Sequence, residues 1–278
     1  MDKAKKEMLQ KKASEIRIDI MEMLCEAGSG HSGGSLSIAD VFAYLYFGGE
    51  LKLDPKNPLM KDRDRVILSK GHACPVLYAT LAEKGYFDKS ILKTLRKFGS
   101  ILQGHPDMKK VPGVDMSTGS LGQGLSAGVG MALGLKLDES SSRVFVIIGD
   151  GESEEGQIWE AAMSAAHYKL GNIIGILDKN GLQIDGFTKD IMNSEPIADK
   201  WRSFGWKVME ISAHDFDEIE TAVLKAKEIK DGPVMIIANS IKGKGVSFME
   251  NQCGWHGKTP NPEERDRAIS EITSALKN

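Results

Sequence analysis

The feature that most constrains the fold is an alternation between short apolar runs and longer amphipathic segments. The apolar runs are rich in Val and Ile and lie at positions 66–68, 144–148, 173–177, 206–209 and 234–237. Runs of this kind are typical of strands that are buried on both faces. Strands that alternate with helices form a parallel sheet covered by helices on both sides. The sequence therefore predicts an α/β fold.

Helical periodicity predicts the segments that surround this sheet. The expected helices cover residues 2–26, 37–47, 122–137, 157–170, 197–204, 216–229 and 261–277. Asp215 stands at the expected cap of the helix over 216–229, with Glu218 at the capping-box position. No internal repeat, low-complexity tract or linker interrupts the sequence, so we expect a single domain over residues 1–278.

Charge and cysteine content exclude several classes of function. The chain has 36 Lys and Arg residues against 39 Asp and Glu, a formal net charge of −3, and no sustained basic block. That balance disfavours binding to nucleic acid or to a membrane surface. Cys25, Cys74 and Cys253 are odd in number and lack metal-type spacing, so we expect reduced thiols in a cytoplasmic protein.

One long uncharged stretch, residues 116–135, has the length of a membrane span. Six of its residues are glycines and several others are polar, which favours a glycine-rich turn that enters a packed helix. The pairs Gly124–Gly128 and Gly130–Gly134 place bare backbone on helical faces. We expect another helix to approach closely there.

Polar residues with metal-binding chemistry follow two of the expected strands. Gly149, Asp150 and Gly151 come directly after one strand, and Asn180 follows the next. Ligands of parallel sheets bind beyond the carboxyl ends of the strands. The carboxylate of Asp150, the amide oxygen of Asn180 and the carbonyl of Leu182 suit a Mg²⁺ ion that also holds phosphate oxygens. Taken alone, Gly-Asp-Gly is more often only a tight turn.

The glycine-rich segment 119–124 is a second place where a phosphate could bind, because it begins an expected helix. It lacks the Gly-x-Gly-x-x-Gly spacing of a dinucleotide site, and no P-loop sequence occurs in the chain. Neither a Rossmann nor a P-loop nucleotide site is therefore supported, and a diphosphate must be held in another way.

Four of the six histidines lie beside glycine in turn-like segments. They are His31, His72, His105 and His256. Reacting groups are usually carried by loops on a rigid sheet, so these four imidazoles are candidates for proton transfer. No pair has the His-x-x-His spacing that would favour zinc. His167, inside an expected helix, and His214, near a helix start, are expected to be structural.

Six motifs occur in the order that is found in transketolases. They are GSGHSGG at 28–34, SKGHA at 69–73, GHP at 104–106, TGSLGQG at 118–124, GDGESEEG at 149–156 and DKN at 178–180. From about residue 10 to 260 the chain resembles the N-terminal, thiamine diphosphate-binding half of that family. It departs from the family at Ser32 and Ser120, where most members have proline.

The resemblance implies which residues hold the cofactor, thiamine diphosphate. Asp150, Asn180 and the carbonyl of Leu182 would bind the Mg²⁺ ion that bridges its diphosphate. Gly151 and His72 would lie near the phosphates. The aminopyrimidine side would be lined by Gly119, Ser120 and Leu121.

The resemblance also implies the reaction, which is transfer of a two-carbon ketol unit from a ketose phosphate to an aldose phosphate. Such a cleavage needs an electron sink, which the cofactor supplies, and groups that stabilise alkoxides and move protons. His31 and His256 would contact the sugar carbonyl and hydroxyls, assisted by His72 and His105. Glu155 would join a carboxylate network that reaches the partner's active site.

Full-length members of the family continue into a second α/β domain that binds the aminopyrimidine, and then into a third domain. After residue 237 this chain has no further buried-strand pattern, only the basic loop 242–245 and a last helix. The resemblance therefore implies one subunit of a split enzyme, active only with a separately encoded C-terminal subunit, in a heterotetramer. The loop at Lys242 and Lys244 either closes over the diphosphate or is a solvated basic turn.

Two alternatives stay open. A 1-deoxyxylulose-5-phosphate synthase shares the Gly-Asp-Gly motif and the histidine layout, but the short chain and the context of residues 30–34 disfavour it. A non-catalytic subunit that only holds thiamine diphosphate, or that regulates another enzyme, is disfavoured because all four histidines are retained. The sequence does not select among sugar phosphates, sulfonated and branched sugars included.

Overall fold

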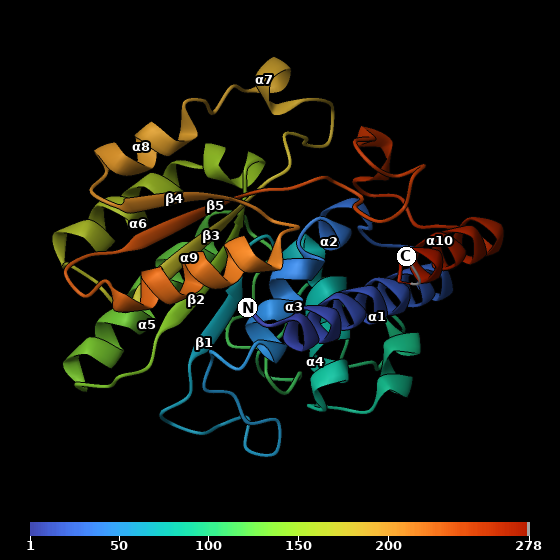
Figure 1. Cartoon of the computed structure of the whole chain (residues 1–278), viewed down its shortest axis with the longest axis horizontal. Helices are drawn as coiled ribbons and strands as arrows, with labels where there is room; N and C mark the ends of the chain where they lie inside the picture. The colour runs from blue at the N-terminus through green and yellow to red at the C-terminus, as the bar shows by residue number, and fades with distance from the viewer. Residues whose placement is uncertain (277–278) are drawn as a thin grey trace.

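A five-stranded parallel sheet organises the chain, in a computed structural model that describes residues 1–276 (Figure 1). Its strand order is β1-β2-β3-β5-β4. The strands are β1 (Arg65–Leu68), β2 (Val144–Gly149), β3 (Ile173–Lys179), β4 (Lys207–Ser212) and β5 (Val234–Asn239). All five predicted strands are present, and the expected α/β fold is confirmed. Burial is almost complete along β2 and β3, which explains their continuous apolar sequences.

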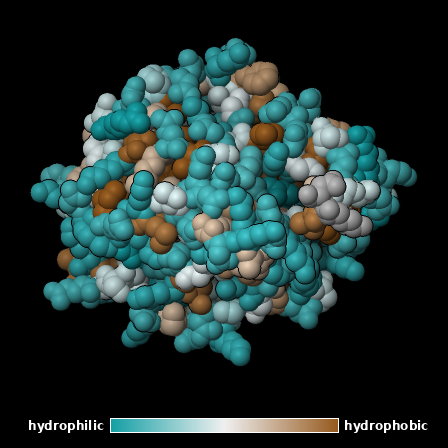
Figure 2. All heavy atoms as spheres, in the orientation of Figure 1, coloured by the Kyte–Doolittle hydropathy of each residue, from teal (hydrophilic) through white to brown (hydrophobic). Residues whose placement is uncertain are grey.

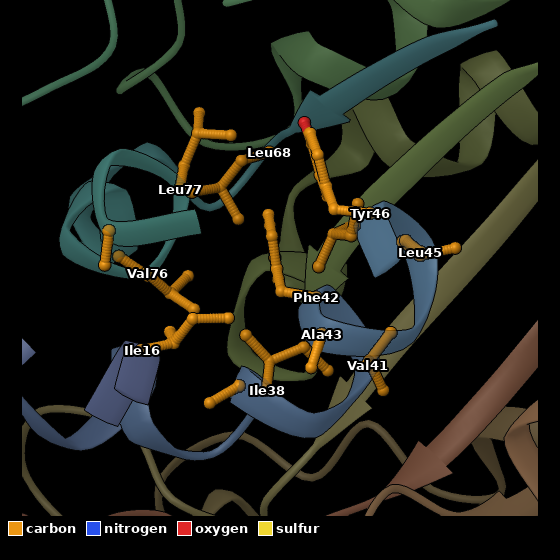
Figure 3. Packing of buried hydrophobic residues seen from close by; sticks show 14 of the residues in the cluster. Ile16, Ile38, Val41, Phe42, Ala43, Leu45, Tyr46, Leu68, Val76 and Leu77 are labelled. Atoms are coloured by element: carbon orange, nitrogen blue, oxygen red, sulfur yellow. The ribbon is translucent and has the colours of Figure 1, made fainter. Parts of the chain in front are cut away.

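Two layers of helices cover the sheet. One face carries α1 (Lys3–Ala27), α3 (Ala39–Phe47), α4 (Cys74–Lys84) and α9 (Phe216–Glu228), and α10 (Pro262–Ala275) packs beside α1. The opposite face carries α5 (Gln123–Leu137), α6 (Gly156–His167) and α8 (Ile197–Ser203). Figure 3 shows the first core, where Phe42 of α3 lies among Ile16, Val76 and Leu68. Burying side chains of this size contributes about 1.5–3 kcal/mol each.

Short helices shape the loops between these elements. They are α2 (Gly33–Leu36), α7 (Thr188–Ile191) and the 3-10 turns η1 (Gly71–Ala73), η2 (Lys89–Thr94), η3 (Gly151–Glu154) and η4 (Cys253–Trp255). α2, η1, η3 and η4 stand next to the residues that the sequence singled out. α7 lies apart from the sheet, at the top of Figure 1.

Several expectations about helices were wrong in detail. The helix expected over 37–47 is α3, which begins two residues later at Ala39, and the short helix α2 precedes it. α4 was not among the expected helices, and Pro75 lies in its first turn, where no backbone donor is lost. Lys277, the last residue of the helix expected at 261–277, lies outside the described residues.

The predicted capping box at α9 is also wrong. Asp215 caps the helix by accepting from the backbone N–H groups of Asp217 and Glu218. The Glu218 carboxylate, however, accepts from the backbone N–H of Ser212, 2.7 Å away. A complete capping box is found instead at α10, between Asn261 and Glu264.

The glycines of α5 meet the sheet rather than a helix. A Cβ on Gly128 would lie 2.6 Å from the Val146 side chain, and a Cβ on Gly124 would lie 2.4 Å from Oγ of Ser69. Gly130 and Gly134 have open space around them. Among the described residues, the expected contact of another helix with these glycines is therefore not present. Gly124 and Gly128 instead let α5 approach β1 and β2.

The surface is largely polar. The face in Figure 2 is mostly hydrophilic, with hydrophobic residues scattered over it. Over residues 1–276 no helix has both the length and the apolar character to cross a bilayer. The uncharged stretch 116–135 accordingly forms a loop and the packed helix α5.

Candidate active site

A cavity of about 380 Å³ lies at the carboxyl ends of β2 and β3. All the residues expected at the site line it, except His105 and Ser120. The expected residues that line it are His31, His72, Gly119, Leu121, Gly149, Asp150, Gly151, Glu155, Asn180, Leu182 and His256. These residues come from six separate stretches of the chain, which the parallel sheet brings to one edge.

The three expected metal ligands lie on the neighbouring turns that follow β2 and β3. Register pairs Gly149 with Asp178, so the residues after each strand emerge side by side. The Asp150 carboxylate accepts from the backbone N–H of Gly181 at 2.6 Å, between Asn180 and Leu182. Asn180 Oδ1 in turn accepts from the N–H of Leu182 at 3.1 Å. Asp150 is therefore hydrogen-bonded to the turn that carries Asn180 and Leu182, and all three residues line the cavity.

These donors fit a hard divalent cation. Asp150 is 4% exposed, and burial, followed by the nearby Asp178 carboxylate, raises the pKa of Asp150 to about 6. A carboxylate held in such surroundings gains from a cation that replaces its proton. Among residues 1–276 no three His, Cys, Asp or Glu side chains gather as a metal-binding group. The oxygen donors suit Mg²⁺ with further ligands from a diphosphate.

The cavity also contains polar atoms that have no partner. Glu154 Oε1 and Gln183 Oε1 are buried without a hydrogen bond, and both residues line the cavity. A Cβ on Gly151 would lie 3.3 Å from Gln183 Oε1, so the bare backbone keeps this space free. Buried polar groups normally have partners, and because both atoms are acceptors, donor groups of a ligand or a cation would satisfy them.

Three histidines form a contiguous cluster in the cavity. The ring centroids of His31 and His72 are 5.1 Å apart, those of His72 and His256 5.2 Å, and those of His31 and His256 5.5 Å. Burial is the main cause that lowers the pKa of His31 to about 4, of His72 to about 2 and of His256 to about 3, and nearby cations add to it. At neutral pH the cluster is therefore uncharged and can both donate and accept protons.

His105 stands apart from that cluster. A Cβ on Gly119 would lie 2.9 Å from Cδ2 of His105, so the ring packs against the bare backbone of Gly119. Tyr78 fixes the loop by donating to the carbonyl of His105 at 3.0 Å. Gly119 has a φ of 148°, in the region that favours glycine. His105 is thus an exposed residue that does not line the cavity and packs against Gly119, on the expected aminopyrimidine side.

Ser32, one of the two positions where the sequence departs from the pattern it resembles, joins two histidine loops. Its hydroxyl lies 2.7 Å from the carbonyl oxygen of Lys258 and 3.2 Å from that of Trp255. Ser32 is completely buried. The substitution therefore adds a hydrogen-bonded link between the loop of His31 and that of His256, which proline could not make.

A buried ion pair that the sequence reasoning missed lies below the cavity. The ammonium of Lys70 donates to the carboxylate of Asp178 and, at 2.7 Å, to the carbonyl of Gly34. Ser37 donates to the same carboxylate at 2.6 Å. Burial alone would raise the pKa of Asp178, but Lys70 and the hydroxyl donors outweigh it and lower the pKa. The only available signal was the position of Lys70 beside the His72 motif.

Lys242 also lines the cavity, so the solvated turn expected as one alternative is wrong for this residue. Lys242 is 1% exposed, whereas Lys244 is partly exposed beside Glu250. The Lys242 ammonium donates to the carbonyl of Leu182 at 3.0 Å. Burial, and then repulsion by Lys70, lower its pKa to about 8. A cation at this position can contact a diphosphate directly.

Glu152 and Glu155, two of the three glutamates of the GDGESEEG motif, have different surroundings. Glu152, which the sequence reasoning did not select, is buried and accepts from the N–H groups of Gly122 and Gly149, each at 3.0 Å. It also accepts from Ser69, so it ties three loops around the cavity. Glu155 lines the cavity and is exposed at the start of α6.

The remaining histidines lie outside the cavity. His214 Nδ1 is 2.7 Å from the Asp40 carboxylate, and its Nε2 accepts from the N–H of Ile241 at 3.0 Å. His167 is exposed at the end of α6, with its ring beside that of Tyr168. Both placements agree with the structural roles expected for them. The three cysteines are free thiols, and burial raises the pKa of Cys74 to about 12.

Comparison with known proteins places this site in a family. The model of the transketolase thiamine diphosphate-binding domain matches residues 8–270. The chain is 50% identical over 264 residues to the 6-deoxy-6-sulfo-D-fructose transketolase subunit SqwG of Clostridium sp. (strain MSTE9), covering 95% of this chain and 96% of that protein. It is 40% identical over 270 residues to an apulose-4-phosphate transketolase subunit of Phocaeicola vulgatus, covering 97% of this chain and 95% of that protein.

Solved structures agree with the sequence matches. The crystal structure of transketolase from Campylobacter jejuni aligns with a TM-score of 0.91 and 32% identity, over 98% of this chain. The chain spans 43% of that longer protein. With the matched family model and the relatives above, the chain belongs to the family of transketolase thiamine diphosphate-binding domains.

Proposed function

We propose that this chain is the cofactor-binding subunit of a two-subunit transketolase that moves a two-carbon ketol unit between a ketose and an aldose. One observation carries the proposal: the His31, His72 and His256 cluster shares a single cavity with the oxygen donors Asp150 and Asn180. A site of this kind combines a place for a diphosphate-bound cation with neutral imidazoles beside it.

The residues of this chain would each contribute a separate step. Asp150, Asn180 and the Leu182 carbonyl hold Mg²⁺, and thiamine diphosphate when bound supplies the electron sink for carbon–carbon cleavage. His31 and His256 bind the sugar carbonyl and hydroxyls and move protons there. The ring of His72 contacts the rings of His31 and His256, and His72 assists these two residues. His105 assists from the side of Gly119.

A second subunit would complete the site. Two relatives that match nearly the full length of this chain are named as subunits, and the chain spans 43% of a full-length transketolase. We infer a C-terminal partner that carries the pyrimidine-binding domain, with Glu155 at the boundary and a heterotetramer as the assembly. The whole chain would be one domain, residues 1–278, and the free thiols fit a cytoplasmic location.

The substrates we propose are sugars with an anionic end. The relatives are named for 6-deoxy-6-sulfo-D-fructose and for apulose 4-phosphate, which differ in both the anion and the carbon skeleton. A sulfonated or branched sugar therefore fits as well as a linear ketose phosphate. A cofactor-holding subunit without catalysis is the alternative, and the intact histidine cluster argues against it.

The test combines this chain with the product of the neighbouring gene in the genome. Two-carbon transfer is followed for linear, branched and sulfonated ketoses, with Mg²⁺ and thiamine diphosphate present. The proposal predicts transfer by the mixture and none by either chain alone. Cofactor binding with no transfer from any ketose would favour the non-catalytic alternative.

A further inference from the structure

Arg96 touches two of the loops that carry histidines. Its Nη1 donates to Oγ of Ser29 at 2.9 Å, two residues before His31. A Cβ on Gly104 would lie 2.9 Å from Cζ of Arg96, so the guanidinium packs on bare backbone, one residue before His105. Arg96 thus lies between the loop of His31 and the loop of His105.

The backbone at Arg96 is held in an unfavourable conformation. Its φ is 60°, a left-handed value that Arg96 shares with only three other non-glycine residues in 1–276. Its N–H donates to the carbonyl of Leu102 at 2.8 Å and closes the turn 96–102. A left-handed φ is unfavourable for arginine, and glycine would avoid this strain.

The guanidinium has no carboxylate partner. None of the ion pairs within residues 1–276 involves Arg96, although it is only partly exposed. Its charge acts on the titratable groups nearby, which are His31, His105, Cys74 and Tyr78. Burial is the main cause that lowers the pKa of His105, and the charge of Arg96 is the second. The pKa of His31 is likewise lowered by burial and then by Arg96, with smaller contributions from His105 and Lys242. The other titratable neighbours of His31 are the rings of His72 and His256.

We propose that Arg96 is a positioning residue of the active site, which links the loops of His31 and His105 and keeps both imidazoles in place. The guanidinium does this from outside the cavity, because Arg96 is not among the residues that line it. This role of Arg96 deepens the proposed function. Only the kinetic test rests on that function, because the surroundings of the two histidines can be measured in this chain by itself.

The first test is histidine titration by NMR in the isolated chain, with imidazoles labelled by ¹⁵N. In Arg96→Gln the pKa of His105 should rise toward its ordinary value, because the neighbouring positive charge is lost. Arg96→Lys should keep the pKa nearer to that of the wild type. Lys97→Gln, an exposed cation at the next position, is the control and should leave His105 unchanged. An unchanged His105 titration in Arg96→Gln would overturn the proposal.

The second test is kinetic and uses the complex with the partner subunit. Arg96→Gln should lower kcat on the order of tenfold or more, with unchanged affinity for thiamine diphosphate, because imidazole placement is loosened while the cofactor site is intact. Added guanidinium at non-denaturing concentration should restore part of kcat, which a purely structural defect would not show. A full kcat in Arg96→Gln overturns the proposal. If the wild-type complex transfers no ketol unit, the proposed function fails while the NMR result still decides the role of Arg96.

Discussion

The ammonium of Lys242 lies 2.8 Å from Nδ1 of His256. An ammonium can only donate, so Nδ1 accepts and the proton of the neutral imidazole is on Nε2. The same ammonium donates to the carbonyl of Leu182. Lys242 therefore connects the histidine cluster to the turn after β3 and fixes the tautomer of His256 that carries its proton on Nε2.

Removing this imidazole should slow the reaction more than it weakens cofactor binding. In His256→Ala, kcat of the reconstituted complex should fall on the order of 10²-fold or more, as is usual when a group that transfers protons is lost. Titration calorimetry should show thiamine diphosphate affinity close to that of the wild type. The control is His167→Ala on the exposed end of α6. A large loss of affinity would instead make His256 a diphosphate ligand.

Loss of the Asp150 carboxylate should abolish Mg²⁺-dependent binding of the cofactor. Asp150→Ala removes the one charged ligand of the proposed set, while β2 and its register are unaffected. Calorimetry with thiamine diphosphate should show no added affinity when Mg²⁺ is supplied, and circular dichroism should match the wild type. Glu160→Ala, an exposed acidic residue on α6, is the control. Mg²⁺-dependent binding that survives in Asp150→Ala would exclude the assigned metal site.

The buried histidines should make stability depend on pH. Burial lowers the pKa of His31 to about 4, below the ordinary value near 6.5, so the unfolded chain binds more protons between these values. The free energy of unfolding should therefore fall as pH decreases from about 6.5 toward 4. In His31→Gln this slope should be smaller by about 1 kcal/mol per pH unit. Urea titrations over this range measure both slopes, and equal slopes would refute the burial of a neutral His31.

Breaking the Lys70–Asp178 pair should destabilise the chain. Lys70→Met leaves a completely buried carboxylate without its cation, which costs about 3–5 kcal/mol. Adding Asp178→Asn should recover part of this loss, because the remaining charge is removed. Lys97→Met, in an exposed pair with Glu26, should change the free energy of unfolding by less than about 1 kcal/mol. Equal stability of Lys70→Met and the wild type would contradict the assigned pair.

The sheet was predictable because buried parallel strands require continuous Val and Ile runs, and the five runs matched five strands. Asp150 and Asn180 were predictable for the same reason, because each follows a strand end directly. α4 was missed because a proline at a helix start and a proline that ends a helix look alike locally.

The charged residues of the site were harder to recognise. Lys70, Lys242 and Glu152 are buried only because segments distant in sequence close around them. A lysine in a loop is usually solvated, and no local pattern distinguishes the exceptions. The separation of His105 from the other three rings is likewise a property of tertiary packing, since all four histidines have similar glycine-flanked sequences.

The most direct test of the central claim is to locate the metal. Crystals of the complex with the partner subunit, thiamine diphosphate and Mn²⁺ in place of Mg²⁺ would show the metal by its anomalous scattering. We predict one peak bound by Asp150, Asn180 and the carbonyl of Leu182, with the diphosphate on its open side and the partner subunit over the aminopyrimidine. A metal bound elsewhere, or a cofactor enclosed by this chain alone, would contradict the account.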